Sequence, residues 1–194
     1  MAQAREARHG SVVNPPSRAQ KYLAEWQAAG LESGKFFPAT EAGLKDPYAP
    51  DDTPNVQPPQ DGRIASAGKD FAVKLDEPDS VQNWDKHPVP AGRTLDITWS
   101  YHARHKTRRW NYFLTRNGWD PAAPLTRAQF DSAPIATFQN DGQPYWEADL
   151  MPEDPTIHSV TLPSDRQGYH VLLSAWEVAD TGNAFYQVID LDIT

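Results

Sequence analysis

Most of the chain after about residue 70 consists of short apolar runs, alternating or continuous, separated by turn-forming residues. Alternation is typical of a strand with one buried face, and a short continuous run is typical of a strand buried on both faces. We predict strands at 71–75, 94–105, 109–115, 134–140, 156–162, 169–178 and 184–193. Because no helical pattern alternates with these strands, we expect an all-β protein that folds as an antiparallel β-sandwich.

The first third of the chain has a different pattern. Residues 11–16 (SVVNPP) predict a short strand ended by prolines. Residues 17–30 (SRAQKYLAEWQAAG) predict one short helix, with a serine cap, apolar positions at helical spacing and a closing glycine. From 36 to 68 the sequence is rich in proline, aspartate and glycine, which predicts a long ordered loop. Loops of this length usually carry function.

Two of the predicted strands point to one end of the sandwich. In 94–105 the odd-numbered positions form an apolar stripe that ends in His105. In 184–193 the odd-numbered positions form a second stripe that begins with Phe185. Odd-numbered residues of a strand share one face. If these strands are antiparallel neighbours, His105 and Phe185 meet at one tip of the sandwich.

The composition limits the classes of partner. The chain has 194 residues, which fits one domain, and no cysteine, which excludes disulfides, thiolate metal ligands and a cysteine nucleophile. Its 18 Lys and Arg against 26 Asp and Glu leave a net charge of −8, which argues against nucleic acid or an anionic membrane as partner. We expect a neutral partner, and the 7 Trp, 7 Tyr and 7 Phe supply stacking surfaces.

Histidines are the first candidates for chemistry, and the chain has six: His9, His87, His102, His105, His158 and His170. Residues three apart on a strand face opposite sides, so His102 and His105 are not expected to share a metal ion. The pattern alone favours His105 as a hydrogen-bonded histidine that closes the core. We interpret His170 as structural and His87 as part of a surface loop.

Other charged groups give weaker signals. Glu25, Glu32, Glu41 and Glu147 stay open as candidate carboxylates, because spacing in the sequence does not reveal which of them are close in space. We interpret the basic run RHKTRR (104–109) as a solvated strand end or turn in a chain of negative net charge. The sequence contains no P-loop, G-x-S-x-G or G-x-G-x-x-G motif.

Six segments, in order along the chain, carry a likeness to a known family. They are HGSVVNPPSR (9–18), EAGLKD (41–46), DGRIASAG (61–68), ARHKTRRWNYFLTRNGWDPAAPLTRAQFD (103–131), FQNDG (138–142) and LPSDRQGYHVLLSAWEVADTGNAFYQVIDLDI (162–193). On these segments the chain resembles the bacterial lytic polysaccharide monooxygenases of auxiliary-activity family ten, also called type-4 chitin-binding domains. The resemblance implies a single domain over 9–194. Its fold would be an immunoglobulin- or fibronectin III-like antiparallel β-sandwich with a large loop and helix insertion after the first strand.

The resemblance also implies a mononuclear copper site of the kind called a histidine brace. In this site the N-terminal histidine gives its α-amine and a ring nitrogen, and a second histidine gives a third nitrogen; by motif match these are His9 and His105. Phe185 matches the aromatic residue on the axial side of the metal, and Ala103 matches the small residue that shapes access on the other side. Copper is the implied cofactor, with an external electron donor and O2 or H2O2 as co-substrates.

The activity implied by the resemblance is oxidative cleavage of glycosidic bonds in chitin or a related crystalline β-1,4-glycan. The positions that match the flat polymer-binding face are Phe36, Phe37, His102, Asp180 and Asn183. Trp176 matches a buried tryptophan near the copper, and its simplest role is core packing. The resemblance implies a monomeric, extracellular protein whose partner is an insoluble polysaccharide, chitin first of all.

Three features depart from the family pattern. Residues 1–8 precede His9 as an N-terminal extension or uncleaved leader remnant, and no signal peptide is recognisable, so a cytoplasmic location or another route of release stays open. The acidic residue that the family has just before GLK is Ala42 here, with Glu41 one position earlier. The disulfides usual in the family are missing.

These departures keep two other functions open. A chain that retains residues 1–8 would be a non-catalytic chitin- or polysaccharide-binding protein with an incomplete copper site, since a mid-chain amide nitrogen does not replace a free amine. The third possibility is a sandwich module that makes protein contacts.

Overall fold

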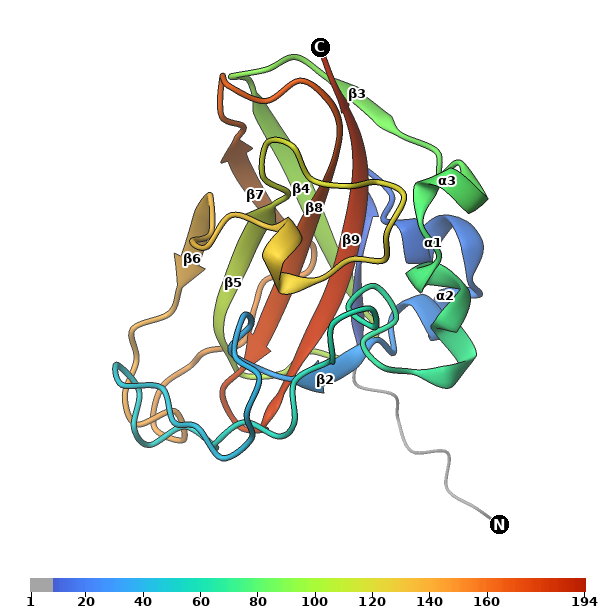
Figure 1. The fold of residues 1–194 in the computed structure, drawn as a ribbon. Coiled ribbons are helices and arrows are strands. Elements are labelled where there is room, and N and C mark those ends of the chain that lie inside the picture. Colours follow the sequence, from blue (N-terminus) through green and yellow to red (C-terminus); the bar gives the residue numbers. More distant parts are fainter. Residues whose placement is uncertain (1–8) are drawn as a thin grey trace.

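The computed structural model describes residues 9–194, and the predicted N-terminal extension, residues 1–8, lies outside them (Figure 1). In chain order the elements are β1 (Gly10–Asn14), α1 (Arg18–Tyr22), α2 (Glu25–Ala28), β2 (Glu32–Gly34), the 3-10 helix η1 (Asp70–Asp76), α3 (Asp79–Gln82), β3 (His87–Val89), β4 (Thr94–Tyr101), β5 (Thr107–Leu114), the 3-10 helix η2 (Arg127–Gln129), β6 (Ala136–Gln139), β7 (Thr156–Thr161), β8 (Gly168–Val178) and β9 (Asn183–Ile193). The helices are short and the strands carry the fold, which confirms the all-β prediction.

The strands form two sheets. The smaller sheet has the order β1-β4-β7, and the larger has the order β2-β9-β8-β5-β6, with β3 added on β9. All pairings are antiparallel except the short parallel pairing of β3 with β9. The predicted β-sandwich is therefore confirmed, with one short parallel strand that the pattern did not reveal.

A core of large apolar side chains fills the space between the two sheets. The odd-numbered residues of β4, from Leu95 to Tyr101, are buried there, as the alternating pattern predicts. They pack with residues of the larger sheet such as Trp110, Leu172 and Trp176. Burial of this apolar surface holds the two sheets face to face.

A second core covers the outer face of the larger sheet. It combines residues from β5, β8 and β9 with Leu125 and Phe130, which lie between β5 and β6, and with residues of the segment between β1 and β3, including Leu31, Phe37, Ile64 and Trp84. Strands β8 and β9 are consequently buried on both faces, which explains why their sequences are almost continuously apolar. The long loop and helix insertion after the first strand is present, and it supplies this second layer.

The segment predicted as one helix over 17–30 is two helices, α1 and α2. The predicted cap is present, because the backbone N–H of Gln20 donates to Oγ of Ser17 (3.1 Å). Leu23 and Ala24 both have extended backbone angles, and this interrupts the helix.

Three other sequence expectations about elements are wrong or incomplete. Residues 71–75 lie in η1 and not in a strand; its buried residues Ala72 and Leu75 are three apart, the spacing of one 3-10 turn. The strand predicted over 94–105 ends at Tyr101, so His105 lies in the following loop. Strands β2 and β3 have only three residues each, too few to give a periodic signal, and His87 belongs to β3 and not to a loop.

Two side-chain interpretations have opposite outcomes. His170 is structural as expected: it is buried, and its Nδ1 shares a hydrogen bond with Oγ1 of Thr115 (2.8 Å). The RHKTRR run is not a solvated strand end throughout, because Arg108 is only 1% exposed and forms a buried ion pair with Asp52 (2.7 Å).

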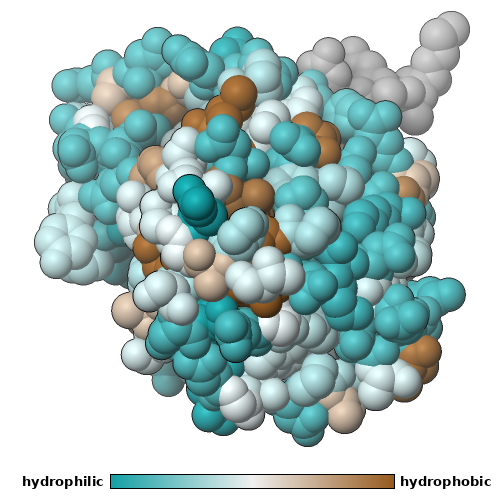
Figure 2. Space-filling view, turned by 90° about the horizontal axis from the view of Figure 1, so that it is seen from above, coloured by the Kyte–Doolittle hydropathy of each residue, from teal (hydrophilic) through white to brown (hydrophobic). Residues whose placement is uncertain are grey.

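Within residues 9–194, no helix is long and apolar enough to cross a membrane. Figure 2 shows the end of the molecule at which the C-terminus lies. Hydrophilic residues dominate this end, and the hydrophobic patches on it are separate. No single broad apolar surface is therefore visible at this end.

His158 is expected to make stability fall in mild acid. It is buried, stacks on Phe138 with ring centroids 4.0 Å apart, and its Nδ1 shares a hydrogen bond with Oη of Tyr112 (2.7 Å). Burial lowers the pKa of His158 from 6.5 to about 4. Between these two values the unfolded chain binds the proton more readily than the folded protein. Stability is therefore lost as pH falls through this window, by roughly 3 kcal/mol in total.

Urea unfolding measured at several pH values between 7 and 4 tests this expectation. His158→Gln should be less stable at pH 7 but should show a clearly flatter dependence on pH. His102→Gln, at an exposed histidine, is the control and should keep the wild-type slope. An unchanged slope in His158→Gln would show that other groups cause the acid sensitivity.

Candidate metal centre

His9 and His105 lie together at the end of the sandwich opposite the C-terminus. His9 immediately precedes β1, and His105 lies in the loop between β4 and β5. The carbonyl oxygen of His9 accepts hydrogen bonds from the backbone N–H groups of His102 (2.8 Å) and Ala103 (3.3 Å). These bonds extend the pairing of β1 with β4 and hold His9 against the loop that carries His105.

Phe185 lies beneath both imidazoles. Its ring centroid is 5.7 Å from that of His9 and 5.9 Å from that of His105, and its side chain is fully buried. The predicted meeting of His105 and Phe185 is therefore present, but the premise was wrong. Strands β4 and β9 belong to different sheets, and the two residues meet across the sandwich.

A buried tryptophan supports this arrangement from below. Trp176 stacks on Phe185 with ring centroids 4.7 Å apart, and its Nε1 donates to Oγ1 of Thr107 (2.7 Å). Thr107 in turn donates from Oγ1 to the backbone carbonyl of His105 (3.0 Å). The tryptophan therefore fixes the backbone of the His105 loop as well as packing in the core.

Gly10 is a site residue that the sequence reasoning missed. A Cβ at this position would lie 2.6 Å from Cδ1 of Tyr101 and 3.0 Å from Cζ3 of Trp176. Contacts this short do not occur between real side chains, so the chain next to His9 comes this close to the aromatic core only with glycine here. The signal in the sequence was the glycine that follows the histidine, but one glycine alone does not reveal such an approach.

The surroundings of His9 favour its neutral imidazole. Burial lowers the pKa of His9, and the nearby His105, His102 and Lys69 act in the same direction, while the carboxylate of Glu32 opposes them. Nδ1 of His9 is buried and has no hydrogen-bond partner among residues 9–194. A buried, neutral imidazole nitrogen without a protein partner is suited to bind a metal ion.

Within residues 9–194, no group of three or more His, Asp or Glu side chains is placed to hold a metal ion. Nδ1 of His105 lies 3.7 Å from Oδ1 of Asp180. A metal ion bound by the imidazoles of His9 and His105 would therefore need further ligands that are not His, Asp or Glu side chains of such a group.

The family model for "lytic polysaccharide mono-oxygenase, cellulose-degrading" matches residues 9–191. The chain belongs to the lytic polysaccharide monooxygenases of auxiliary-activity family ten. The family expected from the sequence is thereby confirmed.

Two curated relatives carry informative names. GlcNAc-binding protein A of Shewanella oneidensis is 36% identical to the chain over 195 residues, which is 96% of this chain and 36% of the relative. The lytic chitin monooxygenase of Enterococcus faecalis is 39% identical over 132 residues, which is 68% of this chain and 62% of the relative. The chain therefore spans about a third to two thirds of the length of these relatives.

Solved structures agree with the family. A chitin binding domain from Burkholderia pseudomallei is 52% identical, with a TM-score of 0.93, and the match covers 96% of this chain and 100% of that one. A Bacillus amyloliquefaciens CBM33 domain solved in complex with Cu(I) is 34% identical, with a TM-score of 0.70, and the match covers 96% of this chain and 100% of that one. Copper is therefore found in structures of this family.

Most of the predicted polymer-binding residues of this family member lie at or near its surface. His102 is exposed, and its Nε2 is 3.4 Å from Oε1 of Glu25. Asp180 and Asn183 are partly exposed, and Asn183 lines a hollow of about 440 Å³ together with Glu32. Phe36 is partly exposed too.

Phe37 is the exception, and its expected place on the polymer-binding face is wrong. Its side chain is only 5% exposed and packs edge-to-face on Phe113 (5.0 Å between ring centroids) and Phe130 (5.8 Å) in the second core. Phe36 has a positive φ of 79°, so this pair of residues does not follow a regular strand alternation, and the sequence did not show which ring is buried.

The structure also places the two other residues named from the family motif. Ala103 is partly exposed in the loop between His102 and His105. Glu41 has an exposed side chain, and its backbone carbonyl accepts a hydrogen bond from Nδ2 of Asn55 (2.9 Å). Glu32, which the sequence left among several carboxylates, is the one whose charge acts on His9.

Replacing Gly10 by alanine should destabilise the monooxygenase fold, because the new methyl group overlaps the rings of Tyr101 and Trp176. We expect a loss of about 1–3 kcal/mol in the free energy of unfolding, the usual cost of overpacking a core. Denaturant unfolding of Gly10→Ala measures it. Gly30→Ala is the matched control, since its Cβ would meet no atom closer than 3.4 Å, and it should change stability little. Equal stability of Gly10→Ala and wild type would contradict the close packing at this glycine.

Proposed function

We propose that this protein is a copper-dependent monooxygenase that oxidatively cleaves glycosidic bonds in chitin or a related crystalline β-1,4-glycan. The observation that carries the proposal is the pairing of His9 and His105 above the buried Phe185, with Nδ1 of His9 buried and without a hydrogen-bond partner in the part of the chain that the structure describes. The names of the chitin monooxygenase relative and of the chitin binding domain support chitin as the substrate.

The donor set fits copper. Imidazole nitrogen is a good ligand for copper, and nitrogen ligation in a plane favours Cu(II). In the proposal, His9 gives a ring nitrogen and its α-amine, and His105 gives the third nitrogen. When bound, copper supplies the redox chemistry that activates O2 or H2O2 with electrons from an external donor. The α-amine becomes available only when residues 1–8 are removed, because in their presence this nitrogen belongs to a peptide bond.

The other residues of the centre position the ligands and control access. Phe185 fills one side of the centre with carbon atoms that donate no ligand and exclude water there. Ala103 leaves room on the other side because its side chain is a single methyl group. Trp176 and Thr107 hold the backbone of His105 through consecutive hydrogen bonds. We propose Glu41 as the carboxylate that assists the reaction; Glu32, whose charge acts on His9, is the alternative.

The proposed polymer-binding face surrounds the two histidines. Phe36, His102, Asp180 and Asn183 are its members, and their partly exposed side chains offer an aromatic ring and hydrogen-bonding groups to a sugar chain. A neutral, insoluble polysaccharide suits a chain with a net charge of −8 better than an anionic polymer does. In this proposal the protein acts as an extracellular monomer.

The second candidate is a non-catalytic polysaccharide-binding protein with the same fold. The eight residues before His9 favour it, since a chain that keeps them lacks the α-amine ligand. It predicts chitin binding that is insensitive to EDTA and ascorbate.

Copper binding should depend on both histidines and on the amine. We expect tight binding of one Cu(II) by protein that begins at His9, measured by calorimetry. The affinity should fall at least about 100-fold in His105→Ala and in protein that retains residues 1–8, since each lacks one nitrogen ligand. His102→Ala is the control and should bind copper like the wild type. Equal affinity in His105→Ala would refute the site.

Oxidised oligosaccharides should appear when protein that begins at His9 acts on chitin with copper, ascorbate and H2O2. Mass spectrometry of the soluble fraction detects them, and parallel reactions on cellulose test the related glycan. His105→Ala should give none, because it no longer holds the metal. Retention on chitin without any oxidised product, from protein that binds copper tightly, would favour the binding protein instead.

A further inference from the structure

Two exposed aromatic side chains lie on loops beside the His105 segment. Tyr48 is 78% exposed and Trp146 is 56% exposed. Neither belongs to the core or to the candidate metal centre. Tyr and Trp are enriched among the side chains that contribute most to binding.

The loop that carries Trp146 is joined to the loop that carries His105. The backbone N–H of Thr107 donates to the carbonyl of Leu150 (2.8 Å), and Nζ of Lys106 donates to the carbonyl of Tyr145 (3.1 Å). Nη1 of Arg104 donates to the carbonyl of Pro152 (3.1 Å). Trp146 is therefore on a segment continuous with the proposed polymer-binding face.

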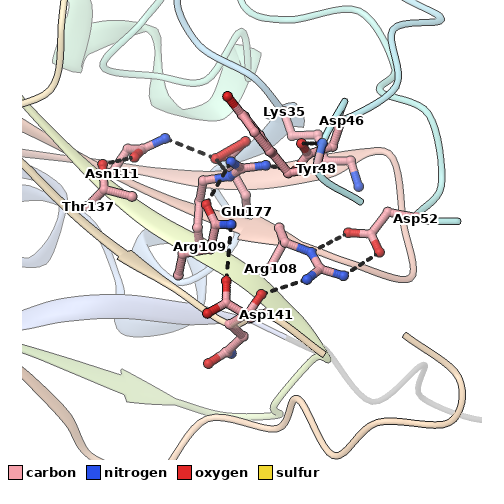
Figure 3. Close-up of polar contacts among 12 residues, drawn as sticks. Lys35, Asp46, Tyr48, Asp52, Arg108, Arg109, Asn111, Thr137, Asp141 and Glu177 are labelled. Atoms are coloured by element: carbon pink, nitrogen blue, oxygen red, sulfur yellow. Dashed lines mark hydrogen bonds and ion pairs between the residues drawn. The ribbon is translucent and has the colours of Figure 1, made fainter. Parts of the chain in front are cut away.

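Arg108 holds this loop and the loop of Tyr48 together. Its guanidinium forms a two-bond ion pair with Asp52 (2.7 and 2.8 Å) and also donates to the carbonyls of Asn140 (2.6 Å) and Gly142 (3.1 Å). Figure 3 shows Arg108 directed at Asp52. Because both charges are buried, losing either side chain would leave the other charge without its partner. The ion pair therefore fixes the two loops side by side.

Arg109 fixes the Tyr48 loop from the next position of the chain. It forms ion pairs with Asp46 and with Glu177, whose Oε2 is 2.9 Å from Nε of Arg109 (Figure 3). Oδ1 of Asp46 accepts the backbone N–H of Tyr48 (2.9 Å). The backbone of Tyr48 is thus held in a turn, and its ring can present a surface without a large loss of conformational entropy on binding.

Beside Tyr48 lies a hollow of about 330 Å³ that also includes Phe36. Its lining combines apolar residues such as Phe36, Leu44 and Tyr48 with polar ones such as Asn111. A pyranose ring likewise combines C–H groups with hydroxyls. The charged residues of the lining, Lys45, Asp46, Arg109 and Glu177, are two of each sign, which suits an uncharged ligand.

We propose that Tyr48 and Trp146 form an aromatic extension of the polymer-binding face, on which sugar units of the same β-1,4-glycan chain stack away from the metal centre. This proposal rests on the proposed function for the identity of the polymer. Carboxylates near Trp146, those of Asp141, Glu147 and Asp149, disfavour an anionic partner and can accept hydrogen bonds from sugar hydroxyls. Arg108 and Arg109 act as positioning residues that keep both aromatic loops in place.

Binding isotherms on insoluble chitin and on cellulose test the extension, with the protein kept in EDTA so that the result is independent of metal chemistry. Tyr48→Ala and Trp146→Ala should each weaken the apparent affinity between about twofold and tenfold, the range expected for loss of one aromatic stacking contact. Trp146→Phe should keep most of the affinity, because it retains a stacking ring. Tyr22→Ala, at an exposed aromatic of α1, is the matched control and should bind like the wild type.

Copper affinity measured on the same variants should stay at the wild-type value, which shows that the fold and the metal centre are intact. If Tyr48→Ala or Trp146→Ala binds chitin and cellulose with the affinity of the wild type, the role of that residue is overturned and the proposed function still stands. If the wild type binds neither polymer, with copper or with EDTA, the glycan function fails and the extension fails with it.

Discussion

The contact between Trp176 and Phe185 is the interaction on which the candidate metal centre depends. The two residues are directly opposite each other on β8 and β9, the longest strands of the larger sheet, and their rings stack. Cross-strand aromatic pairs of this kind stabilise a sheet locally. Here the pair also forms the surface against which both imidazoles pack. Glycine is required at position 10 because a Cβ there would lie 2.6 Å from Cδ1 of Tyr101 and 3.0 Å from Cζ3 of Trp176.

Buried ion pairs connect the irregular parts of the chain to this sheet. Arg18 of α1 pairs with Asp190 of β9 (2.6 Å) and donates to the carbonyl of Leu75 in η1 (2.7 Å). Arg108 of β5 binds Asp52 of the long loop in the same two-bond manner. A charge left alone in such a place is strongly unfavourable, so these pairs restrict how the long insertion packs. The chain has no cysteine, so these ion pairs, and not disulfides, link the loops to the sheet.

The parts of the fold that could be predicted from the sequence are those with long periodic patterns. Strands β4, β5, β8 and β9 have eight to eleven residues and were located within a few positions. Strands of three residues and a helix interrupted by two extended residues left no such signal. For the site, the stripes ending at His105 and beginning at Phe185 predicted that the two would meet. The burial of Phe37 and Arg108 depends on tertiary packing, so neither a family motif nor a charge pattern revealed it.

The C-terminal strand, β9, ends at the opposite end of the molecule from the histidine pair (Figure 1). Two backbone hydrogen bonds hold Thr194 there: its N–H donates to the carbonyl of Val89 (3.1 Å), and its carbonyl accepts from the N–H of Ala91 (2.9 Å). Any polypeptide joined after Thr194 therefore departs away from the surface that would lie on a solid polymer. A second module or an immobilisation tag attached at this point leaves the contact with an insoluble substrate unobstructed, whereas an attachment before His9 would convert the α-amine of that residue into a peptide nitrogen.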